Sequence, residues 1–443
     1  MTRRLLPMVI LCLVAAIGRS AETADPRIEN WHAWRGPLAN GVAPNADPPT
    51  TWNETTNVKW KVPLPGEGSA TPIVWNDRVF ALAAARTDRA VETLPPPKAE
   101  PPGGYLTQRP KNYYRFVVMC FDRRTGKLVW QHVAAEAIPH EGRHATNTYA
   151  SASPTTDGRR LYVSFGSRGI FAYDLDGAPL WQRDLGDVIT RFGWGEGTSP
   201  VVHDGRLIVN GDHEGDSFLV VLDAATGETL WRADRDEVTS WATPLVVPHA
   251  GRTQLITPAT RRITSYDLDT GEILWECGGL TTNVIPCPVV YGDLVICLSG
   301  HQRSAGCAVP LDSQGDVTGT DRIAWRLDRG TPYVPSPLLY GSLLYFTQSN
   351  RAILTCLDPA GGEPLAEGVR LPELKTLYAS PVGAAGRVYF TSREGTTLVI
   401  KNQAELDVVA LNRLDEGIDA SPALVDREIF LRSQRHLYCI AEQ

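Results

Sequence analysis

Short apolar stretches alternate with polar turns along this chain, and the alternation repeats at a nearly constant interval. A Ser/Thr/Cys-Pro step opens each repeat, and after the first interval of 82 residues the steps follow one another every 41 to 49 residues. The prolines are Pro72, Pro154, Pro200, Pro244, Pro288, Pro337, Pro381 and Pro422. Each step leads into an apolar strand, a turn and a second strand, as in "SPVVHDGRLIVNG" (199–211), where Asp-Gly supplies the turn geometry.

A second marker lies later in each repeat: an apolar residue, an Asp, a turn that often carries Thr-Gly, and a Trp. Clear copies are "FDRRTGKLVW" (121–130), "YDLDGAPLW" (173–181), "LDAATGETLW" (222–231) and "YDLDTGEILW" (266–275). The Asp can cap its own turn, Gly accepts a positive φ, and Trp is a large apolar group suited to the space between neighbouring sheets. The copies near Asp312 and Asp358 are degenerate, and the unit near Val408–Ala410 has lost both Asp and Trp.

Each period of about 44 residues therefore holds four strands, which is typical of a propeller blade and not of a two-helix repeat. The eighth unit begins at Pro422 and ends one strand short, whereas "NVKWKVPLPG" (57–66) carries a marker Trp before the first step. The sequence predicts an all-β, eight-bladed β-propeller with four-stranded antiparallel blades. The N-terminal strand at Asn57–Gly66 is expected to complete the last blade by pairing with His436–Ile440.

Two segments depart from the repeat. Between residues 85 and 111 the first blade carries a Pro-rich insertion, "TLPPPKAEPPGG" (93–104), which we expect to be an exposed, mobile loop; a docking segment is the alternative. Residues 21–56 precede the ring, and the two Trp of "WHAWRGP" (31–37) favour an extension that packs on it. The propeller itself is assigned to residues 57–443.

Residues 1–20 have the order of a secretory signal peptide. Arg3 and Arg4 precede an apolar run from Leu5 to Gly18, which is about 14 residues long and too short for a permanent membrane span. Cys12 lies inside this run after Leu11, so no lipoprotein site is predicted. No other stretch approaches membrane-spanning length, and we expect an exported chain in the periplasm or cell envelope.

The charge balance limits the class of partner. The formal net charge of −7 becomes −10 once residues 1–20 are removed, because three Arg and no acid leave with them. An acidic chain without a run of Lys or Arg is a poor candidate for binding nucleic acid.

At these markers the chain resembles a known family. The paired Ser-Pro and Asp-x-x-Thr-Gly-x-x-x-Trp motifs are similar to the pyrroloquinoline-quinone (PQQ) repeat. The order of "WRGP", "NTYASASP", "GWGEGTSP", "RGTPYVPSPLLYG" and "EGIDASPAL" resembles exported PQQ-like propellers over about 390 residues. That group is similar to quinoprotein alcohol dehydrogenases and to the outer-membrane protein assembly factor B (BamB-like) proteins. The resemblance implies either a cofactor enzyme or a non-catalytic scaffold.

Residues just before each Ser/Thr-Pro step are expected to lie nearest the propeller axis. Three positions before each Pro these are Ser69, Ser151, Gly197, Trp241, Ile285, Val334, Tyr378 and Asp419, and one position earlier they are Gly68, Ala150, Glu196, Ser240, Val284, Tyr333, Leu377 and Ile418. Only two are carboxylates, and a hard divalent cation needs about six oxygen ligands. We predict Trp194, Glu196, Trp241, Tyr378 and Asp419 as the ligand-facing set at the channel mouth; the alternative is that they only fill it.

No catalytic constellation emerges. The chain has no Cys-Cys pair, haem Cys-x-x-Cys-His, Gly-x-Ser-x-Gly or His-Glu-x-x-His motif. His140 and His144 lie in a loop and are interpreted as surface residues. The prediction is therefore no catalytic residue, no metal and no cofactor, with PQQ left open but without a metal shell to support it.

Seven Cys remain after the signal segment. Cys120, Cys356 and Cys439 occupy one repeat position, which holds Ala172 and Val221 in other blades, so they are interpreted as small core residues. Cys287 and Cys297 fall on the two strands of one hairpin; a disulfide between them is allowed by the spacing and not established by it.

The leading hypothesis from sequence is a monomeric, non-catalytic scaffold that binds envelope or outer-membrane proteins, taking extended segments at exposed blade edges. The alternative is a PQQ-dependent oxidoreductase or another ligand-binding enzyme that uses the channel around Trp241 and Glu196. A third hypothesis, carbohydrate recognition, rests only on the number of aromatic residues.

Overall fold

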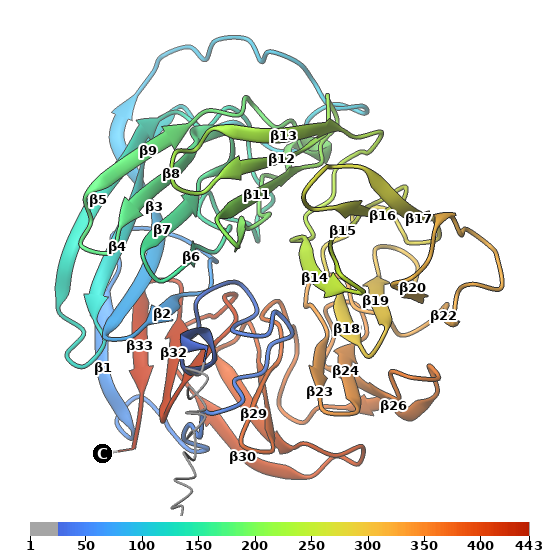
Figure 1. The fold of residues 1–443 in the computed structure, drawn as a ribbon. Coiled ribbons are helices and arrows are strands. Elements are labelled where there is room, and N and C mark those ends of the chain that lie inside the picture. The colour runs from blue at the N-terminus through green and yellow to red at the C-terminus, as the bar shows by residue number, and fades with distance from the viewer. Residues whose placement is uncertain (1–24, 443) are drawn as a thin grey trace, which may run out of the picture.

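The computed structural model describes residues 25–442, so the predicted signal peptide at 1–20 lies outside the described residues. Within this range the chain forms eight antiparallel sheets arranged around a common axis (Figure 1). Helical structure in residues 25–442 is confined to three short 3-10 helices: η1 (Pro26–Glu29), η2 (Gly166–Arg168) and η3 (Arg191–Gly193). The predicted all-β, eight-bladed propeller is confirmed.

The strands of each blade are given in order from the axis outward. Blade 1 contains β2 (Ile73–Trp75), β3 (Arg78–Ala90), β4 (Asn112–Asp122) and β5 (Leu128–Ala137); blade 2 contains β6 (Thr155–Thr156), β7 (Arg160–Ser164), β8 (Ile170–Asp174) and β9 (Pro179–Arg183); blade 3 contains β10 (Val201–His203), β11 (Arg206–Gly211), β12 (Phe218–Asp223) and β13 (Thr229–Asp234); blade 4 contains β14 (Leu245–His249), β15 (Arg252–Pro258), β16 (Ile263–Asp267) and β17 (Ile273–Cys277), with β21 (Gly315–Asp316) added outside. Blade 5 contains β18 (Val289–Tyr291), β19 (Leu294–Ser299), β20 (Ala305–Pro310) and β22 (Trp325–Leu327); blade 6 contains β23 (Leu338–Tyr340), β24 (Leu343–Thr347), β25 (Ile353–Leu357) and β26 (Pro364–Arg370); blade 7 contains β27 (Val382–Ala384), β28 (Arg387–Thr391), β29 (Thr396–Lys401) and β30 (Val408–Arg413); blade 8 contains β31 (Ala423–Val425), β32 (Glu428–Arg432), β33 (His436–Ile440) and β1 (Val58–Pro63).

The ring closes as the sequence predicts. The N-terminal strand β1 pairs antiparallel with β33, with Trp60 opposite Cys439 and Pro63 opposite His436. Blade 8 therefore combines the two ends of the chain in one sheet, and a strand from residues 58–63 supplies the edge that residues 423–440 lack. This pairing buries the marker Trp60 against the neighbouring blade.

The Asp–Thr–Gly–Trp marker is explained by a contact between successive blades. Trp60 donates its Nε1–H to the carbonyl oxygen of Arg123 at 2.9 Å and lies flat on the turn of blade 1. The turn residue is Gly126 at φ +70°, where a Cβ would lie 2.7 Å from the indole. Asp122 caps the same turn by accepting a hydrogen bond from the Thr125 amide at 2.8 Å. The marker thus builds both halves of an interblade contact, here called the Trp–Gly contact.

The Trp–Gly contact recurs around the ring. It is formed by Trp130 on Gly177, Trp181 on Gly227, Trp231 on Gly271 and Trp325 on Gly362. In register, the marker Trp130 faces Cys120, Trp181 faces Ala172 and Trp231 faces Val221. The bulky indole leaves room only for a small partner, which agrees with the interpretation of these cysteines as size-limited core residues.

The Ser/Thr-Pro marker builds a second set of contacts, nearer the axis, which we call the hydroxyl ring. The amide of Thr71 donates to Ser153 Oγ at 3.0 Å, and the amide of Ser153 donates to Ser199 Oγ at 2.9 Å. The same link joins Ser199 to Thr243, Cys287 to Ser336, Ser336 to Ser380, and Ser380 to Ser421. Each hydroxyl therefore satisfies a buried amide of the preceding blade.

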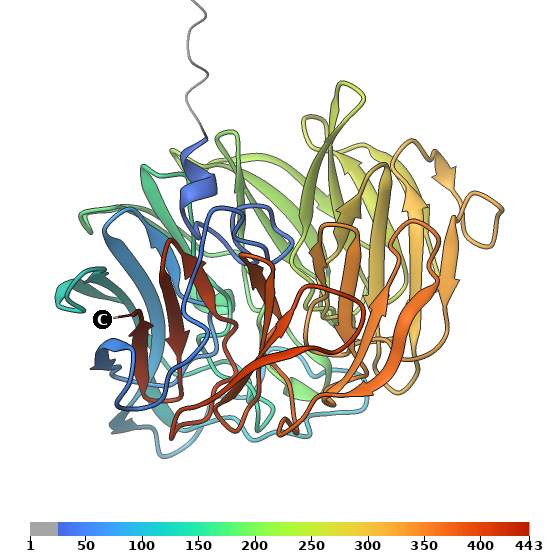
Figure 2. The same cartoon turned by 90° about the horizontal axis from the view of Figure 1, so that it is seen from below.

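The extension before the ring lies across one face of the propeller. Trp31 forms a bridge with Val74 in blade 1, and the carbonyl of Gly41 accepts from the Gly383 amide in blade 7. Further along, Asn53 bridges in parallel to Arg413 at the outer edge of blade 7. The chain thus crosses from one side of the ring to the other before it enters β1 (Figures 1 and 2).

The Pro-rich insertion is largely exposed over residues 93–104, as predicted, and contacts the ring at a few points. β3 and β4 extend well beyond the other blade strands, and the loop after them turns back. The Leu106 amide donates to the carbonyl of Phe192 at 3.0 Å, Thr107 Oγ1 donates to the carbonyl of Gly193 at 2.6 Å, and Lys98 Nζ lies 2.7 Å from Asp187. Figure 2 shows the insertion on the face opposite to the extension. Polar partners on blades 2 and 3, which the sequence of the loop does not reveal, hold it there.

Candidate functional site: the axial cavity

A cavity of about 440 Å³ lies on the propeller axis. Its wall contains all eight residues that stand three positions before the Ser/Thr-Pro steps, from Ser69 in blade 1 to Asp419 in blade 8. Because every blade starts its inner strand at the same point of the repeat, the same position faces the axis in each. The structure therefore confirms the ring of positions that the repeat predicts.

One side of the cavity is formed by the N-terminal extension. Trp34 lines it and donates its Nε1–H to Cys287 Sγ at 2.9 Å. Cys287 stands where most other blades have the hydroxyl of the ring, so the extension contacts the ring where that hydroxyl is absent. The neighbouring Arg35 is buried and donates to the carbonyl of Pro337 at 2.9 Å, which anchors this turn of the chain on blade 6.

Aromatic rings surround another part of the cavity. Trp194 and Trp241 are stacked with ring centroids 6.4 Å apart and planes inclined by 24°. His301 meets Trp194 edge-on at 6.1 Å and lies 4.9 Å from Tyr333. The Trp241 Nε1–H is satisfied by the carbonyl of Gly195 at 2.7 Å, so this ring is fixed in place. Two parallel indoles and a wide apolar wall suit a flat or ring-shaped group.

The wall also carries neutral polar groups that titrate outside the usual range. Burial raises the pKa of Tyr333 to about 12, and burial together with the nearby Arg191 lowers the pKa of His301. Both groups are therefore uncharged at neutral pH. They offer hydrogen bonds to a ligand without adding a charge.

The carboxylate at the cavity is already paired. Arg393 donates to Asp419 through Nε at 2.5 Å and through Nη2 at 3.0 Å, and its guanidinium lies over the Tyr378 ring, 4.3 Å from the centroid. Burial raises the pKa of Asp419 even though Arg393 opposes the shift. A bidentate ion pair of this kind occupies both carboxylate oxygens.

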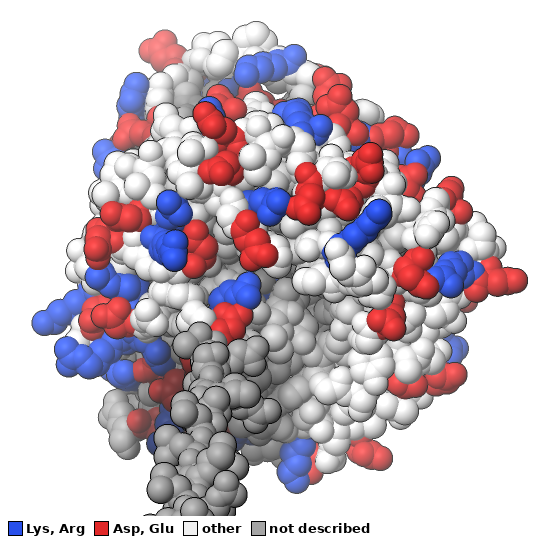
Figure 3. Space-filling view, in the orientation of Figure 1, with Lys and Arg blue, Asp and Glu red and all other residues white. Residues whose placement is uncertain are grey.

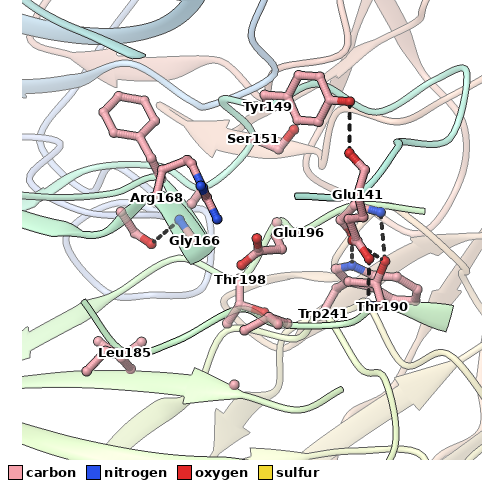
Figure 4. A pocket seen from close by; sticks show the side chains of 18 of the residues that line it. Glu141, Tyr149, Ser151, Gly166, Arg168, Leu185, Thr190, Glu196, Thr198 and Trp241 are labelled. Carbon is pink, nitrogen blue, oxygen red and sulfur yellow. Dashed lines mark hydrogen bonds between the residues drawn. The ribbon is translucent and has the colours of Figure 1, made fainter. Parts of the chain in front are cut away.

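The structure places Glu196 outside the axial cavity that the other four predicted site residues line, and of these four only Trp241 also lines the pocket of Glu196. Trp194, Trp241, Tyr378 and Asp419 line the axial cavity, whereas Glu196 lines a smaller pocket of about 80 Å³ between blades 2 and 3 (Figure 4). Both oxygens of Glu196 accept from the Ser167 amide at 3.0 Å. The residue follows the repeat position that the backbone predicts, but its side chain turns away from the axis toward η2.

A second acid that the sequence did not single out lies in this small pocket. Glu141 is almost fully buried and accepts hydrogen bonds from the amide and the hydroxyl of Thr190 at 3.0 and 2.6 Å. Burial, reinforced by the charge of Glu196, raises the pKa of Glu141 to about 8 although the bonds from Thr190 oppose the shift. Glu141 lies in the loop after β5, where no repeat marker indicates a buried acid.

The two cysteines that the sequence places on one hairpin have different neighbours. Cys287 contacts Trp34 at the cavity, whereas Cys297 lies opposite Cys307 in the core between blades 4 and 5. Continuing the β18–β19 register places Cys287 across from Leu298, so that Cys297 points to the other face of the hairpin. Both thiols are free in the structure, which does not bring them together.

PQQ acts together with a divalent cation, which needs a shell of oxygen ligands. Within residues 25–442, no three or more His, Cys, Asp or Glu side chains are arranged to hold a metal ion. Asp419 is engaged by Arg393, and Glu196 by the Ser167 amide. The stacked Trp194 and Trp241 would suit a planar ring, but the oxygen ligands do not fit a metal-bound quinone.

Sequence reasoning missed several members of the cavity. His144 comes from the loop between blades 1 and 2, His301 from the β19–β20 loop within blade 5, and Trp34 from the extension. Arg393, which neutralises Asp419, follows β28 in the neighbouring blade 7. Of these residues, only Trp34 was indicated by the sequence, because its "WHAWRGP" segment was expected to pack on the ring.

The fold and the axial site define the class of protein: an eight-bladed propeller built from PQQ-type repeats. The chain belongs to the family described as outer membrane protein assembly factor BamB, whose model matches residues 115–365 and 216–443. No match is found among curated proteins.

Solved structures share the fold at low sequence identity. BamB from Moraxella catarrhalis is 14% identical with a TM-score of 0.53, covering 81% of this chain and 97% of its own. A europium-containing methanol dehydrogenase is 10% identical with a TM-score of 0.63, covering 94% of this chain and 98% of its own. A quinohemoprotein alcohol dehydrogenase from Comamonas testosteroni is 10% identical with a TM-score of 0.59, covering 94% of this chain and 81% of its own. At such identity these similarities establish the fold and leave the activity open.

Proposed function

We propose that this protein is exported to the cell envelope and acts there as a non-catalytic scaffold that binds another protein by strand addition. The family description, an assembly factor for outer membrane proteins, supports a partner from the envelope. The signal segment expected at residues 1–20 would direct the export. No helix within residues 25–442 has the length and apolar character to cross a membrane.

The observation that carries the proposal is the outer edge of blade 1. β5 runs for ten residues, longer than any other outermost blade strand, and pairs within its sheet only with β4. Leu128, Val129 and Val133 on this strand are 52%, 46% and 48% exposed. A long apolar edge with unpaired backbone groups is a ready template for another strand.

The protein uses strand addition on itself at two other outer edges. β21 pairs in parallel with β17 in blade 4, and Asn53 bridges in parallel to Arg413 of β30 in blade 7. These two edges are covered by segments of the same chain. The edge of β5 has no such cover within residues 25–442, which favours a partner chain as its occupant.

The face seen in Figure 3 offers no charged patch for a partner. On the face shown in Figure 3, Lys and Arg side chains are interspersed with Asp and Glu, with no extended area of one sign. Near the end of β5, Glu136 is held by Arg115 at 2.9 Å. We therefore expect an extended partner segment with alternating apolar residues, bound through backbone hydrogen bonds and the side chains of Leu128, Val129 and Val133.

The test places a photo-crosslinking residue at Val133 of the full chain in the native envelope. The matched control is Leu230 on β13 of blade 3, which is 52% exposed on a shorter outer strand. We expect a discrete crosslinked partner from position 133 and none from position 230. Val133→Lys should abolish the crosslink formed from Val129, because an edge lysine opposes strand pairing.

The partner captured in this way is then purified and added back to the protein. Hydrogen exchange should slow at the amides of β5 and stay unchanged at β13. Equal crosslinking from both strands, or binding without protection of β5, would overturn the proposed surface. Recovery of the native protein with residues 1–20 still attached would count against export.

The second candidate is a ligand-binding enzyme that uses the axial cavity, and the stacked Trp194 and Trp241 favour it. Asp419 is paired with Arg393, and the side chain of Glu196 points away from the axis. Both observations count against a PQQ-dependent enzyme. We expect the melting temperature to stay the same when PQQ and calcium are added at saturating concentration. A rise of several degrees would shift the assignment to a cofactor-dependent oxidoreductase.

A further inference from the structure

The junction between blades 4 and 5 lacks both of the contacts that the repeat builds. Cys287 stands where the hydroxyl acceptor for Thr243 would be, and it contacts Trp34 instead. Trp275, the marker Trp of blade 4, has no turn glycine to lie on and donates to Gln254 of its own blade at 3.1 Å. Within residues 25–442, every other junction keeps the hydroxyl link, the Trp–Gly contact, or both.

A short strand partly replaces the missing contacts. β21, which belongs in sequence to blade 5, pairs with β17 of blade 4 through Trp275 opposite Gly315 and Glu276 opposite Asp316. The Val317 amide adds a bond to the carbonyl of Glu276 at 2.9 Å. The connection between β20 and β22 thus contains a strand that joins the two blades at their outer edge.

Two thiols face each other at the same junction. Cys277 is the last residue of β17 in blade 4, and Cys307 lies in β20 of blade 5. Both are buried in one apolar cluster that spans the two blades. Cys307 stands opposite Arg326 in register, and the thiols of Cys307 and Cys277 are each the largest influence on the pKa of the other.

The environment makes Cys277 the more reactive of the two. The neighbouring thiol of Cys307 lowers the pKa of Cys277, and Arg326 adds to the shift against the effect of burial. Cys297, the other neighbour of Cys307, lies deep in the core, where burial raises its pKa. Since the thiolate is the attacking species, Cys277 is the better nucleophile toward a disulfide oxidant.

We propose that Cys277 and Cys307 form a disulfide that joins blade 4 to blade 5 as the chain folds in an oxidising compartment. In the cell this rests on the proposed export. The Cys277 thiolate attacks a disulfide oxidant such as oxidised glutathione, forms a mixed disulfide and releases one thiolate. Cys307 then loses its proton and attacks the Cys277 sulfur, releasing the second thiol. Two thiols are oxidised by two electrons, and the oxidant is reduced to two thiols.

Peptide mapping tests this pairing directly. The full chain carrying Cys287→Ala is unfolded with reductant, refolded in a glutathione redox buffer, alkylated and digested. Cleavage after Arg303 and before Asp293 places Cys277, Cys297 and Cys307 on three different peptides. We expect a linked peptide that joins Cys277 to Cys307 and is two hydrogens lighter than the sum of its parts. Complete alkylation of all thiols, or a link between Cys297 and Cys307, would overturn the proposal.

Thermal unfolding gives an independent readout that does not depend on digestion. Reductant should lower the melting temperature of the oxidised protein by about 2–5 °C, because the crosslink restricts the unfolded chain. The same reductant should have no effect on Cys277→Ala. Cys356→Ala, which alters a buried thiol in blade 6, should keep the full response. Comparing each variant with and without reductant separates the crosslink from any packing defect. Loss of the response in Cys356→Ala, or its persistence in Cys277→Ala, would contradict the pairing.

A failure of export gives a different result. If the protein isolated from cells is fully reduced while the refolded protein contains the Cys277–Cys307 link, the pairing is supported and the proposed export is wrong. If the isolated protein carries Cys277–Cys307, both are supported.

Discussion

At the scale of single residues, the repeat markers supply the side chains and backbone angles that contact between blades requires. The turn glycine of the Asp–Thr–Gly–Trp marker serves two purposes, since it has a positive φ and leaves its α-carbon bare for the indole of the preceding blade. Gly126 shows both, with φ +70° and a Cβ position 2.7 Å from Trp60. A marker of this kind is readable from sequence because both of its causes are local to the residue type.

Gly126→Ala should therefore destabilise the protein by about 2–4 kcal/mol, from strain at positive φ and from overpacking against Trp60. Gly386→Ala is the matched control, because Gly386 has φ +71° but no neighbouring atom within 4 Å of the added Cβ. It should lose only about 1 kcal/mol, the cost of the backbone. Urea unfolding measures both, and equal losses would show that the Trp–Gly contact contributes nothing.

Buried acids are the residues that sequence reveals least. The carboxyl of Glu141 has its ordinary pKa of 4.5 when unfolded and about 8 when folded, chiefly because of burial. The folded state keeps the proton that the unfolded state releases. The stabilising contribution is therefore complete below pH 4.5 and is lost as pH rises to about 8.

Glu141→Gln should remove this pH dependence, which is worth about 5 kcal/mol between pH 4.5 and 8. Unfolding free energies measured across this range should be flatter in the variant. Glu416→Gln provides a control of opposite sign, because hydrogen bonds from Ser433 and His436 outweigh burial and lower the pKa of Glu416. At neutral pH that variant should be less stable than the parent protein. The difference between the two should disappear as the pH falls through the folded pKa of Glu416. An unaltered pH profile in Glu141→Gln would contradict the assignment.

At the scale of elements, closure depends on one strand. β1 is the outer strand of blade 8, and it is supplied from the other end of the chain. Without it, β33 would expose a free edge, and Trp60 would be absent from the contact with Gly126. The extension before β1 adds contacts to blades 1, 2, 5, 6, 7 and 8, but none of them completes a sheet.

A chain that begins at Gly66 should melt roughly 10 °C or more below the parent and self-associate through the open edge of β33. A chain that begins at Asn53 keeps β1, loses the part of the extension that crosses the ring, and should remain monomeric. Thermal unfolding and size-exclusion chromatography measure the two effects. If both truncated chains melt at the same lowered temperature and self-associate equally, the extension and not β1 holds the ring closed.

At the scale of the whole molecule, the ring is unevenly joined. Blades 2 and 3 share the hydroxyl link from Ser153 to Ser199 and the Trp–Gly contact of Trp181 with Gly227. Blades 4 and 5 have neither, and depend on β21 and on the apolar cluster around Cys277 and Cys307. A closed ring opens first at its weakest junction.

In the reduced protein, the amides of β18 should exchange at least about tenfold faster than those of β10, the corresponding inner strand of blade 3. Oxidation that links Cys277 to Cys307 should reduce this difference. Hydrogen exchange followed by mass spectrometry resolves the two strands. Equal protection in the reduced protein would mean that β21 compensates fully for the missing contacts.

The sequence by itself determined the number of blades, the closure by Asn57–Gly66 and the ring of positions that faces the axis. These follow from motifs whose effects are local: a Pro that opens a strand, an Asp that caps a turn, a Gly that accepts a positive φ. Trp241, Tyr378 and Asp419 line the axial cavity for the same reason, because the repeat places their backbone, whereas Trp194 lines it from the turn that ends η3.

Only the tertiary structure decided where side chains and loops from different blades meet. It turned Glu196 toward Ser167, paired Asp419 with Arg393, placed Trp34 on Cys287 and set Cys277 beside Cys307. Each of these contacts joins segments far apart in sequence or on neighbouring blades, and depends on rotamers and loop paths that the repeat does not specify. Local periodicity fixes the backbone of a propeller, whereas the chemistry of its axis and junctions arises from packing between blades.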